Sequence, residues 1–288
     1  MTNTAVLAGG TQLSGPDPAD RFHRPIRLVS SLRELVAARA LVRTLVEREL
    51  RARYKQTVLG YAWALITPLA LMLVFTLFVN RVAKVETGDV PYPLFAYLGL
   101  IPWTFFSTSV AQGGLSLLQN VALLNKVYCP REVFPLASVG VAAMDSLIAT
   151  GGLIVMLFVF TSPLHATVVW IPVLALVQVA FTVGVTVVIA GVVLYFRDLR
   201  HALPLVLQLA LFATPVAFGL DIVPRGARPL YSFLNPLAPV IDGYRRTVLY
   251  GVPPSWGLLG LGALSSAALL TGGYLLFKRL ETGFADIA

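Results

Sequence analysis

Long apolar stretches alternate with short polar segments along most of this chain. Six stretches are close to or above about 18 residues, the length that a helix needs to cross a bilayer. The fifth is marginal because it carries Pro204 and Pro215. The six predicted spans are Val58–Val79, Leu94–Leu118, Val133–Phe160, Val168–Phe196, Leu203–Leu220 and Trp256–Phe277. We therefore expect an all-α integral membrane protein with six transmembrane helices in a domain that covers residues 57–278.

The segment before the first span has a different pattern. Residues 1–28 are small, polar and punctuated by Pro and Gly, which predicts a disordered tail. Over residues 29–56 apolar positions recur at the helical period, with Leu41 and Leu45 on the opposite side. This pattern predicts an amphipathic interface helix. It either touches both lipid and another protein or only anchors the chain on the membrane surface.

Residues 221–255, between the fifth and sixth spans, form an unusual connection. Their apolar part, Leu230–Ile241, is too short to cross a bilayer and contains Pro236 and Pro239. Irregular backbone at membrane depth is tolerated only inside protein or beside a water-filled cavity. We expect two short re-entrant helices that dip in from outside; the alternative is an ordinary surface loop.

Composition agrees with a membrane protein. The 288 residues are 57% hydrophobic and 12% charged, about half the charged fraction of a soluble domain. The net charge of +8 comes from basic residues at the ends of apolar stretches, a sign of membrane topology and not of nucleic-acid binding. One cysteine, Cys129, excludes an internal disulfide, and three scattered histidines suggest no metal site.

The basic residues also predict which side of the membrane each loop faces. Sixteen of the 22 Lys and Arg residues precede the first span, lie in the loops 119–132 and 197–202, or follow the last span. Cytoplasmic loops carry an excess of such residues. Both termini, including the tail 279–288, are therefore expected on the cytoplasmic side of the membrane.

A charged motif leads into the first span. It reads Arg48-Glu49-Leu50, then Arg53-Tyr54-Lys55-Gln56-Thr57-Val58-Leu59-Gly60, then Trp63-Ala64. This motif resembles R-D/E-L-x-x-R-Y-K-Q-T-x-L-G-x-x-W-A, found in membrane subunits of polysaccharide-exporting ABC transporters, the type-2 permeases. Three further stretches resemble the same family: Val127–Leu136, Phe196–His201 and Asn235–Arg245. The resemblance covers residues from about 48 to 250.

The resemblance implies a homodimer that pairs with two copies of a separate ATP-binding subunit. Its cargo would be a polyprenyl-pyrophosphate-linked polysaccharide of the O-antigen, capsule, teichoic acid or galactan type. The sequence has no Gly-rich loop ending in Gly-Lys-Ser/Thr, so we expect this chain to hold no cofactor and no catalytic residue. ATP and Mg would be bound by the partner. The interface helix and the loop residues Lys126, Arg131 and Glu132 are the expected coupling surfaces.

Four cations at the start of the first span are candidates for the cargo pyrophosphate: Arg48, Arg51, Arg53 and Lys55. Guanidinium groups grip phosphate oxygens in a bidentate fork. The helical period turns Arg53 away from the other three, so Arg51 and Lys55 are the favoured contacts. The alternative is that these charges only attract anionic lipid.

Further candidates lie deeper in the spans. Asp145 is the only acid well inside a predicted span; it either serves a proton relay or, as we prefer, hydrogen-bonds Gln, Ser or Thr of a neighbouring span. The aromatic residues expected to face a passing glycan, or else to form an interfacial belt, are Tyr61, Trp63, Trp103 and Phe106.

The predicted external gate consists of Asn235, Pro236, Asp242 and Arg245, with Asp242 and Arg245 paired. Ala263, Ala267 and Thr271 predict the packing face of the last span.

Three other functions fit the sequence less well. A permease for a drug or small lipid would share the architecture but not the glycan-exporter motifs. A proton-coupled secondary transporter would need paired intramembrane acids and an internal repeat. A membrane glycosyltransferase would need acidic catalytic clusters near the membrane surface.

Overall fold

A computed structural model describes residues 28–55, 57, 59–79, 87–124, 129–163 and 165–281. Three parts of the chain named above lie outside these ranges. They are the predicted tail 1–28 (except residue 28), Lys126 and residues 282–288. Throughout the described part the chain is helical and contains no strand, which confirms the predicted all-α class.

The helices follow one another along the chain with short connections. Their bounds are α1 Leu28–Ala37, α2 Arg39–Tyr54, α3 Trp63–Val74, α5 Tyr92–Gln119, α6 Val121–Leu124, α7 Val133–Val159, α8 Ile171–Tyr195, α9 Leu199–Ala213, α10 Arg228–Leu234, α11 Leu237–Val248 and α12 Trp256–Glu281. Short 3₁₀ turns at Gly60–Ala62, Ala166–Trp170 and Leu220–Ile222, and a π-helical turn at Phe75–Val79, extend or connect them.

Five helical segments within the described residues are long and apolar enough to cross a membrane: Gly60–Phe78, Tyr92–Gln119, Val133–Val159, Ala166–Tyr195 and Trp256–Glu281. The fifth predicted span differs. Its helix α9 has 15 residues, about 22 Å at 1.5 Å per residue, which is short of the roughly 30 Å apolar layer. The helix ends because Thr214 precedes Pro215 and takes an extended conformation (φ −103°, ψ 143°).

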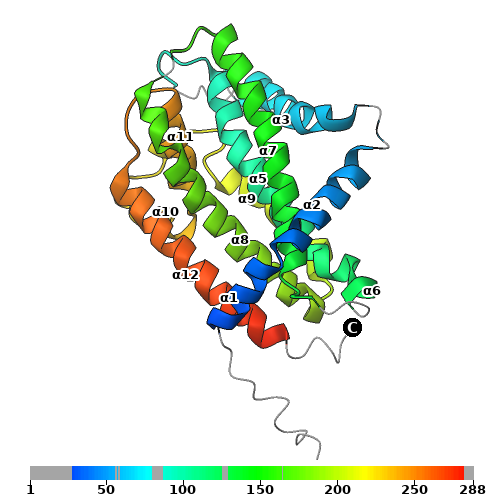
Figure 1. The fold of residues 1–288 in the computed structure, drawn as a ribbon. Helices are drawn as coiled ribbons and strands as arrows, with labels where there is room; N and C mark the ends of the chain where they lie inside the picture. The colour runs from blue at the N-terminus through cyan, green and yellow to red at the C-terminus, as the bar shows by residue number, and fades with distance from the viewer. Residues whose placement is uncertain are drawn as a thin grey trace, which may run out of the picture.

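Helix α5 forms the centre of the bundle. It packs against α7 and α8, and most of its side chains are buried. Helix α12 lies along α8 on the far side from α5 (Figure 1). Its buried residues include Gly262, Ser266 and Gly273, whereas the predicted packing residues Ala267 and Thr271 are exposed. Ala267 and Thr271 therefore do not contribute to the packing of α12 within this chain.

Glycine sets the distance between α8 and α12. A Cβ on Gly184 would lie 3.0 Å from the backbone nitrogen of Leu270, and one on Gly273 would lie 3.2 Å from the Gly184 carbonyl oxygen. The two backbones therefore touch at this level, which is a typical contact between membrane helices. The sequence spacing alone does not tell which small residues of α12 make it.

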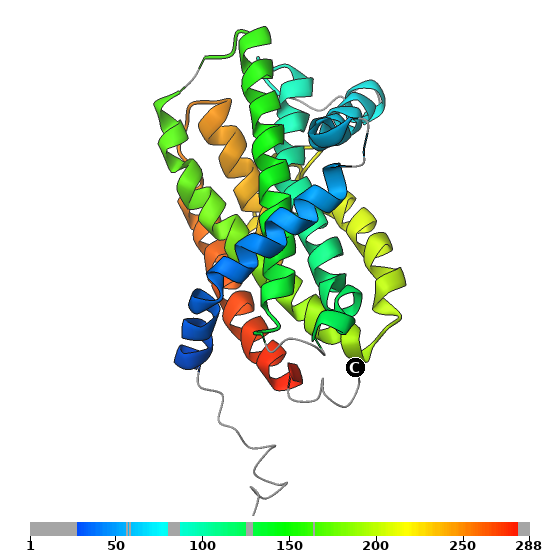
Figure 2. The ribbon, with the colours of Figure 1, turned by 45° about the vertical axis from the view of Figure 1, so that its right-hand side comes forward.

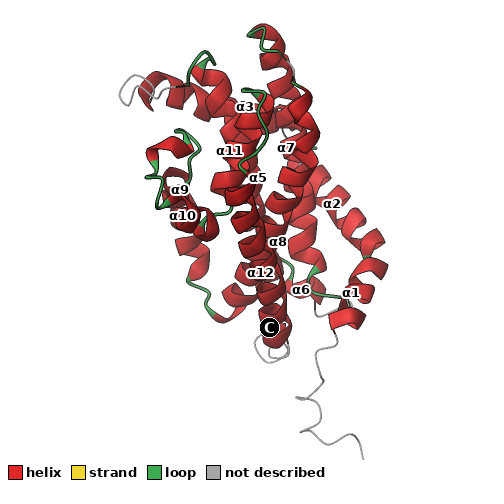
Figure 3. Ribbon diagram, turned by 90° about the vertical axis from the view of Figure 1, so that its left-hand side faces the viewer, coloured by secondary structure: helices red, strands yellow, loops and turns green. Residues whose placement is uncertain are grey.

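The N-terminal helices cross the bundle. Helix α2 runs diagonally over α7, which is clearest in Figure 2. Helix α3 then lies at a steep angle to α5 and α7 (Figures 1 and 3). Helix α3 packs on both α5 and α7, and α2 diverges from it over α7, so a space remains between the four helices.

Candidate functional site

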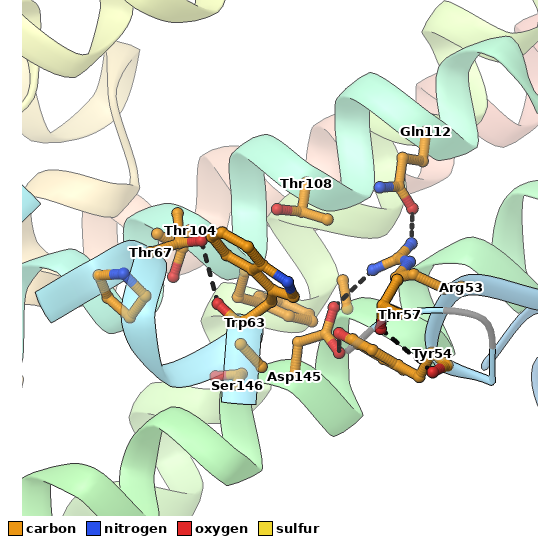
Figure 4. Close-up of a pocket in the computed structure, with 14 residues that line it drawn as sticks. Arg53, Tyr54, Thr57, Trp63, Thr67, Thr104, Thr108, Gln112, Asp145 and Ser146 are labelled. Carbon is orange, nitrogen blue, oxygen red and sulfur yellow. Dashed lines mark hydrogen bonds and ion pairs between the residues drawn. The ribbon is translucent and has the colours of Figure 1, made fainter. Parts of the chain in front are cut away.

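This space is a cavity of about 300 Å³. Figure 4 shows polar side chains from all four helices pointing into it, with the Trp63 indole ring among them. Hydroxyl groups dominate the polar lining, contributed by Thr57, Thr67, Thr104, Thr108 and Ser146. Such a wall of hydroxyls with one large aromatic ring suits a polar, uncharged ligand group better than an ion.

One ion pair forms the end of the cavity near α2. The Arg53 guanidinium donates to Asp145 at 2.6 Å. Arg53 ends the interface helix, and Asp145 lies near the middle of the 27-residue helix α7. An acid at this depth is stabilised by pairing with a cation. The two charges offset each other, so the pair fixes α2 on α7.

Tyr54 and Gln112 complete the cluster. The Tyr54 hydroxyl donates to the second Asp145 oxygen at 2.6 Å, and Gln112 of α5 accepts from Arg53. Burial and the adjacent Asp145 carboxylate raise the pKa of the Tyr54 hydroxyl to about 12. The hydroxyl therefore stays protonated and serves as a donor. Asp145 thus bonds Arg53 and Tyr54 and not the Gln, Ser or Thr that the sequence favoured.

The other three candidate cations lie outside the cavity. Arg48 donates to the Asn120 side chain at 3.1 Å. Arg51 stays 76% exposed beside Glu47 at 3.8 Å, and Lys55 is exposed. The turn of the helix separates Arg53 from these residues, as its period predicts. Arg53 alone among the four lines the cavity.

The four candidate aromatic residues divide into two pairs. Tyr61 and Trp63 are about half exposed, at 51% and 49%, and Trp63 lines the cavity. Trp103 and Phe106 are buried in the core, where their ring centroids lie 5.7 Å apart. The structure therefore brings Trp63 to the site and places Trp103 and Phe106 in the packing of α5.

The predicted coupling loop is tied to the end of α12. Glu132 is 1% exposed and contacts the Lys278 ammonium at 2.5 Å. It also accepts from the Tyr274 hydroxyl at 3.0 Å, and Arg131 donates to the Glu281 carbonyl oxygen at 3.1 Å. The start of α7 and the last turn of α12 are thus joined by buried polar contacts. The third predicted residue, Lys126, lies outside the described residues.

The predicted gate contains a deeply buried charge. Arg245 is 2% exposed and donates to the carbonyl oxygens of Phe95, Pro215, Val216 and Phe218. Its guanidinium also lies 3.6 Å from the centre of the Phe95 ring. It makes no ion pair with Asp242, so the expected pairing is wrong. Because Pro215 interrupts α9, its neighbouring carbonyls lack helical partners, and Arg245 supplies the donors.

The other two gate residues hold the same region together. Asn235 donates to the Thr214 hydroxyl at 2.9 Å, and Pro236 immediately precedes α11. Asn235 and Arg245 therefore both fasten the short helices α10 and α11 to the non-helical backbone after α9.

Sequence reasoning missed the contribution of α5 to the cavity. Thr104, Thr108 and Gln112 recur every four residues, so they share one face. This four-residue spacing is the sequence feature from which a polar face of α5 could have been predicted. Over the described residues, no group of three or more His, Cys, Asp and Glu side chains is placed to hold a metal ion.

Comparison with known proteins places the chain in a family. Residues 40–249 match the ABC-2 type transporter family. The chain belongs to this family. It is 33% identical over 263 residues to an O-antigen export system permease protein of Myxococcus xanthus, covering 91% of this chain and 99% of the relative. A permease protein of the same description from Klebsiella pneumoniae is 29% identical (86% and 94% covered), and a polysialic acid transport protein of Escherichia coli is 26% identical (83% and 93% covered). The family resemblance of the sequence motifs is thereby confirmed.

Proposed function

We propose that this chain is the transmembrane subunit of an ABC transporter that exports a polysaccharide across the cytoplasmic membrane. The observation that carries the proposal is the similarity to an O-antigen export permease over almost the full length of both chains. The five long apolar helices and the hydroxyl-lined cavity between them suit the passage of a polar polymer.

Two copies of this chain pair with two ATP-binding subunits. The sequence has no loop of the Gly-Lys-Ser/Thr type, so ATP and its Mg are held by the partner. Large apolar side chains of α3, of the π-helical turn after it and of α9 are exposed, among them Leu73, Phe78, Leu205, Leu209 and Phe212. These side chains meet lipid and the second copy in the assembled transporter.

The fifth crossing consists of α9 followed by the non-helical segment 214–219. Helices α10 and α11 then re-enter from the outer side before α12 crosses back. Both termini lie in the cytoplasm, because α1, Arg131 and Lys278 gather at one end of the bundle. The Glu132–Lys278 contact lies at this end, where it receives the movement of the ATP-binding subunit.

The cargo carries a polyprenyl pyrophosphate. Arg51 and Lys55 are exposed at the end of α2 and provide the first contact for its phosphates. Arg53 stabilises the cavity behind them through Asp145. The glycan then passes the hydroxyl groups and the Trp63 ring of the cavity.

A deletion strain tests the function. Cells that lack the gene are expected to lose their surface polysaccharide while lipid-linked polymer accumulates in the cytoplasmic leaflet. A plasmid copy of the gene restores the surface polymer. A plasmid that encodes Arg53→Gln with Asp145→Leu serves as a variant of the cavity, because it removes both charges of the ion pair. Unchanged surface polysaccharide in the deletion strain would overturn the proposal.

A further inference from the structure

A second pocket, of about 230 Å³, lies near the first turns of α5 and α12. Its walls are mainly polar and come from the 3₁₀ turn after α9 and from α10, α11 and the residues before α12. The lining includes Asp221, Arg228, Asp242, Arg246, Tyr250 and Ser255. It shares no residue with the cavity beside Asp145.

Two opposite charges, Asp242 and Arg246, face this pocket without a hydrogen bond or an ion pair between them. Asp242 is partly buried, yet within the described part of the chain its carboxylate makes no hydrogen bond or ion pair. Arg246 uses its Nε to donate to the Pro253 carbonyl at 2.9 Å, and its two terminal nitrogens have no partner among the described residues. The pocket therefore presents free acceptors and free donors side by side.

This combination selects the chemistry of a ligand. Asp221 and Asp242 oppose an anion, and Arg228, Arg245 and Arg246 oppose a cation, so this mixed lining selects neither ion strongly. A neutral sugar satisfies both sides, because each hydroxyl group donates one hydrogen bond and accepts others. We propose that this pocket binds one neutral monosaccharide unit of a glycan. The inference rests on the proposed function and assigns the exporter a saccharide subsite at the end of the bundle opposite Glu132.

The size and one aromatic ring of the pocket agree with this assignment. A volume of about 230 Å³ holds roughly seven waters and is smaller than a typical drug-sized site. One pyranose ring with its hydroxyls needs such a space. Tyr250 is 40% exposed, and its hydroxyl donates to the Thr87 carbonyl at 3.2 Å. The bond holds in place a half-exposed aromatic side chain that lines the pocket, and aromatic rings suit the apolar face of a sugar ring.

Saturation-transfer NMR on the purified full chain tests the pocket, because the method detects weak sugar binding. The probes are the methyl pyranosides of glucose, galactose, mannose and rhamnose, with inorganic phosphate as the anionic probe. At least one pyranoside is expected to show saturable transfer. Asp242→Asn and Arg246→Gln should weaken it about tenfold or more, since each removes a charged hydrogen-bond partner.

Two more variants separate binding from folding. Ser255→Trp fills the pocket without altering its charges and should abolish the signal. Arg225→Gln removes an exposed arginine that does not line the pocket and should leave binding unchanged. Each variant is first shown to elute as a single species in size-exclusion chromatography.

The outcomes distinguish this inference from the proposed function. If the chain restores surface polysaccharide in the deletion strain but no pyranoside binds saturably, the subsite is wrong and the function stands. Binding of phosphate in place of pyranosides, or full binding by Asp242→Asn and Ser255→Trp, also overturns the subsite. Pyranoside binding that these variants abolish, in a chain that does not restore surface polysaccharide, keeps the pocket and overturns the function.

Discussion

Replacing Asp145 with asparagine removes the negative charge that Arg53 contacts at 2.6 Å and keeps an acceptor for Tyr54. A hydrogen bond to a charged group contributes about 1.5–3 kcal/mol, and breaking a fully buried ion pair costs about 3–5 kcal/mol. The two side chains are 27% and 19% exposed, so water screens part of the charge. We therefore expect a loss of about 2 kcal/mol, or about 4–8 °C in melting temperature for a chain of this size.

The assay is thermal unfolding of the detergent-purified chain, read by size-exclusion chromatography after heating. Arg53→Gln alone should destabilise the chain similarly, because it leaves Asp145 without a cation. The double variant Asp145→Asn with Arg53→Gln leaves neither charge at the site. It should be more stable than the sum of the two single losses predicts. Arg51→Gln is the matched control, since its exposed ion pair with Glu47 should contribute at most about 1 kcal/mol.

Whether the two losses of stability add decides whether the Arg53–Asp145 pair fixes α2 on α7. If the single variants melt like the wild type, or if their effects simply add in the double variant, the pair does not fix α2 on α7. The account of the cavity would then be refuted.

Three further predictions concern the rest of the bundle. Glu132→Gln should lower stability by about 2 kcal/mol in the same assay, because it removes a buried charged partner of Lys278 and leaves Glu281 as its one remaining carboxylate; wild-type melting would refute the tie between α7 and α12. Gly184→Ala should destabilise by about 1–3 kcal/mol through its contact with α12, whereas Gly272→Ala, with open space around its Cβ, should stabilise slightly; equal effects would contradict the close helix contact. Arg245→Lys should speed hydrogen exchange in residues 216–218, since one ammonium cannot reach four carbonyls; unchanged exchange would contradict the role of this arginine.

Local physical rules predicted much of this fold. Apolar length located the long helices. The fifth span was marginal in the sequence, and its helix α9 ends just before Pro215 although it contains Pro204. The helical period placed Arg53 apart from Arg51. These features depend on neighbouring residues, so the sequence carries them directly.

The remaining features depend on contacts between distant residues. Asp145 meets an arginine 92 positions earlier, and Arg245 finds its acceptors in Phe95 and in the segment after Pro215. The prediction for Arg245 failed because an acid three residues earlier seemed the nearest partner, while unsatisfied carbonyls leave no mark in a sequence. Similarly, small residues occur on several faces of α12, so spacing could not identify the face that contacts α8.

Transport in inverted membrane vesicles tests the central claim most directly. Vesicles that contain this chain and its ATP-binding partner are supplied from outside with lipid-linked polysaccharide carrying a radiolabelled sugar. With ATP and Mg, the account predicts that label becomes protected from an added glycosidase inside the vesicles, and that vesicles lacking this chain protect none. Equal protection without this chain, or no ATP-dependent protection with it, would contradict the claim that it forms the path of a polysaccharide exporter.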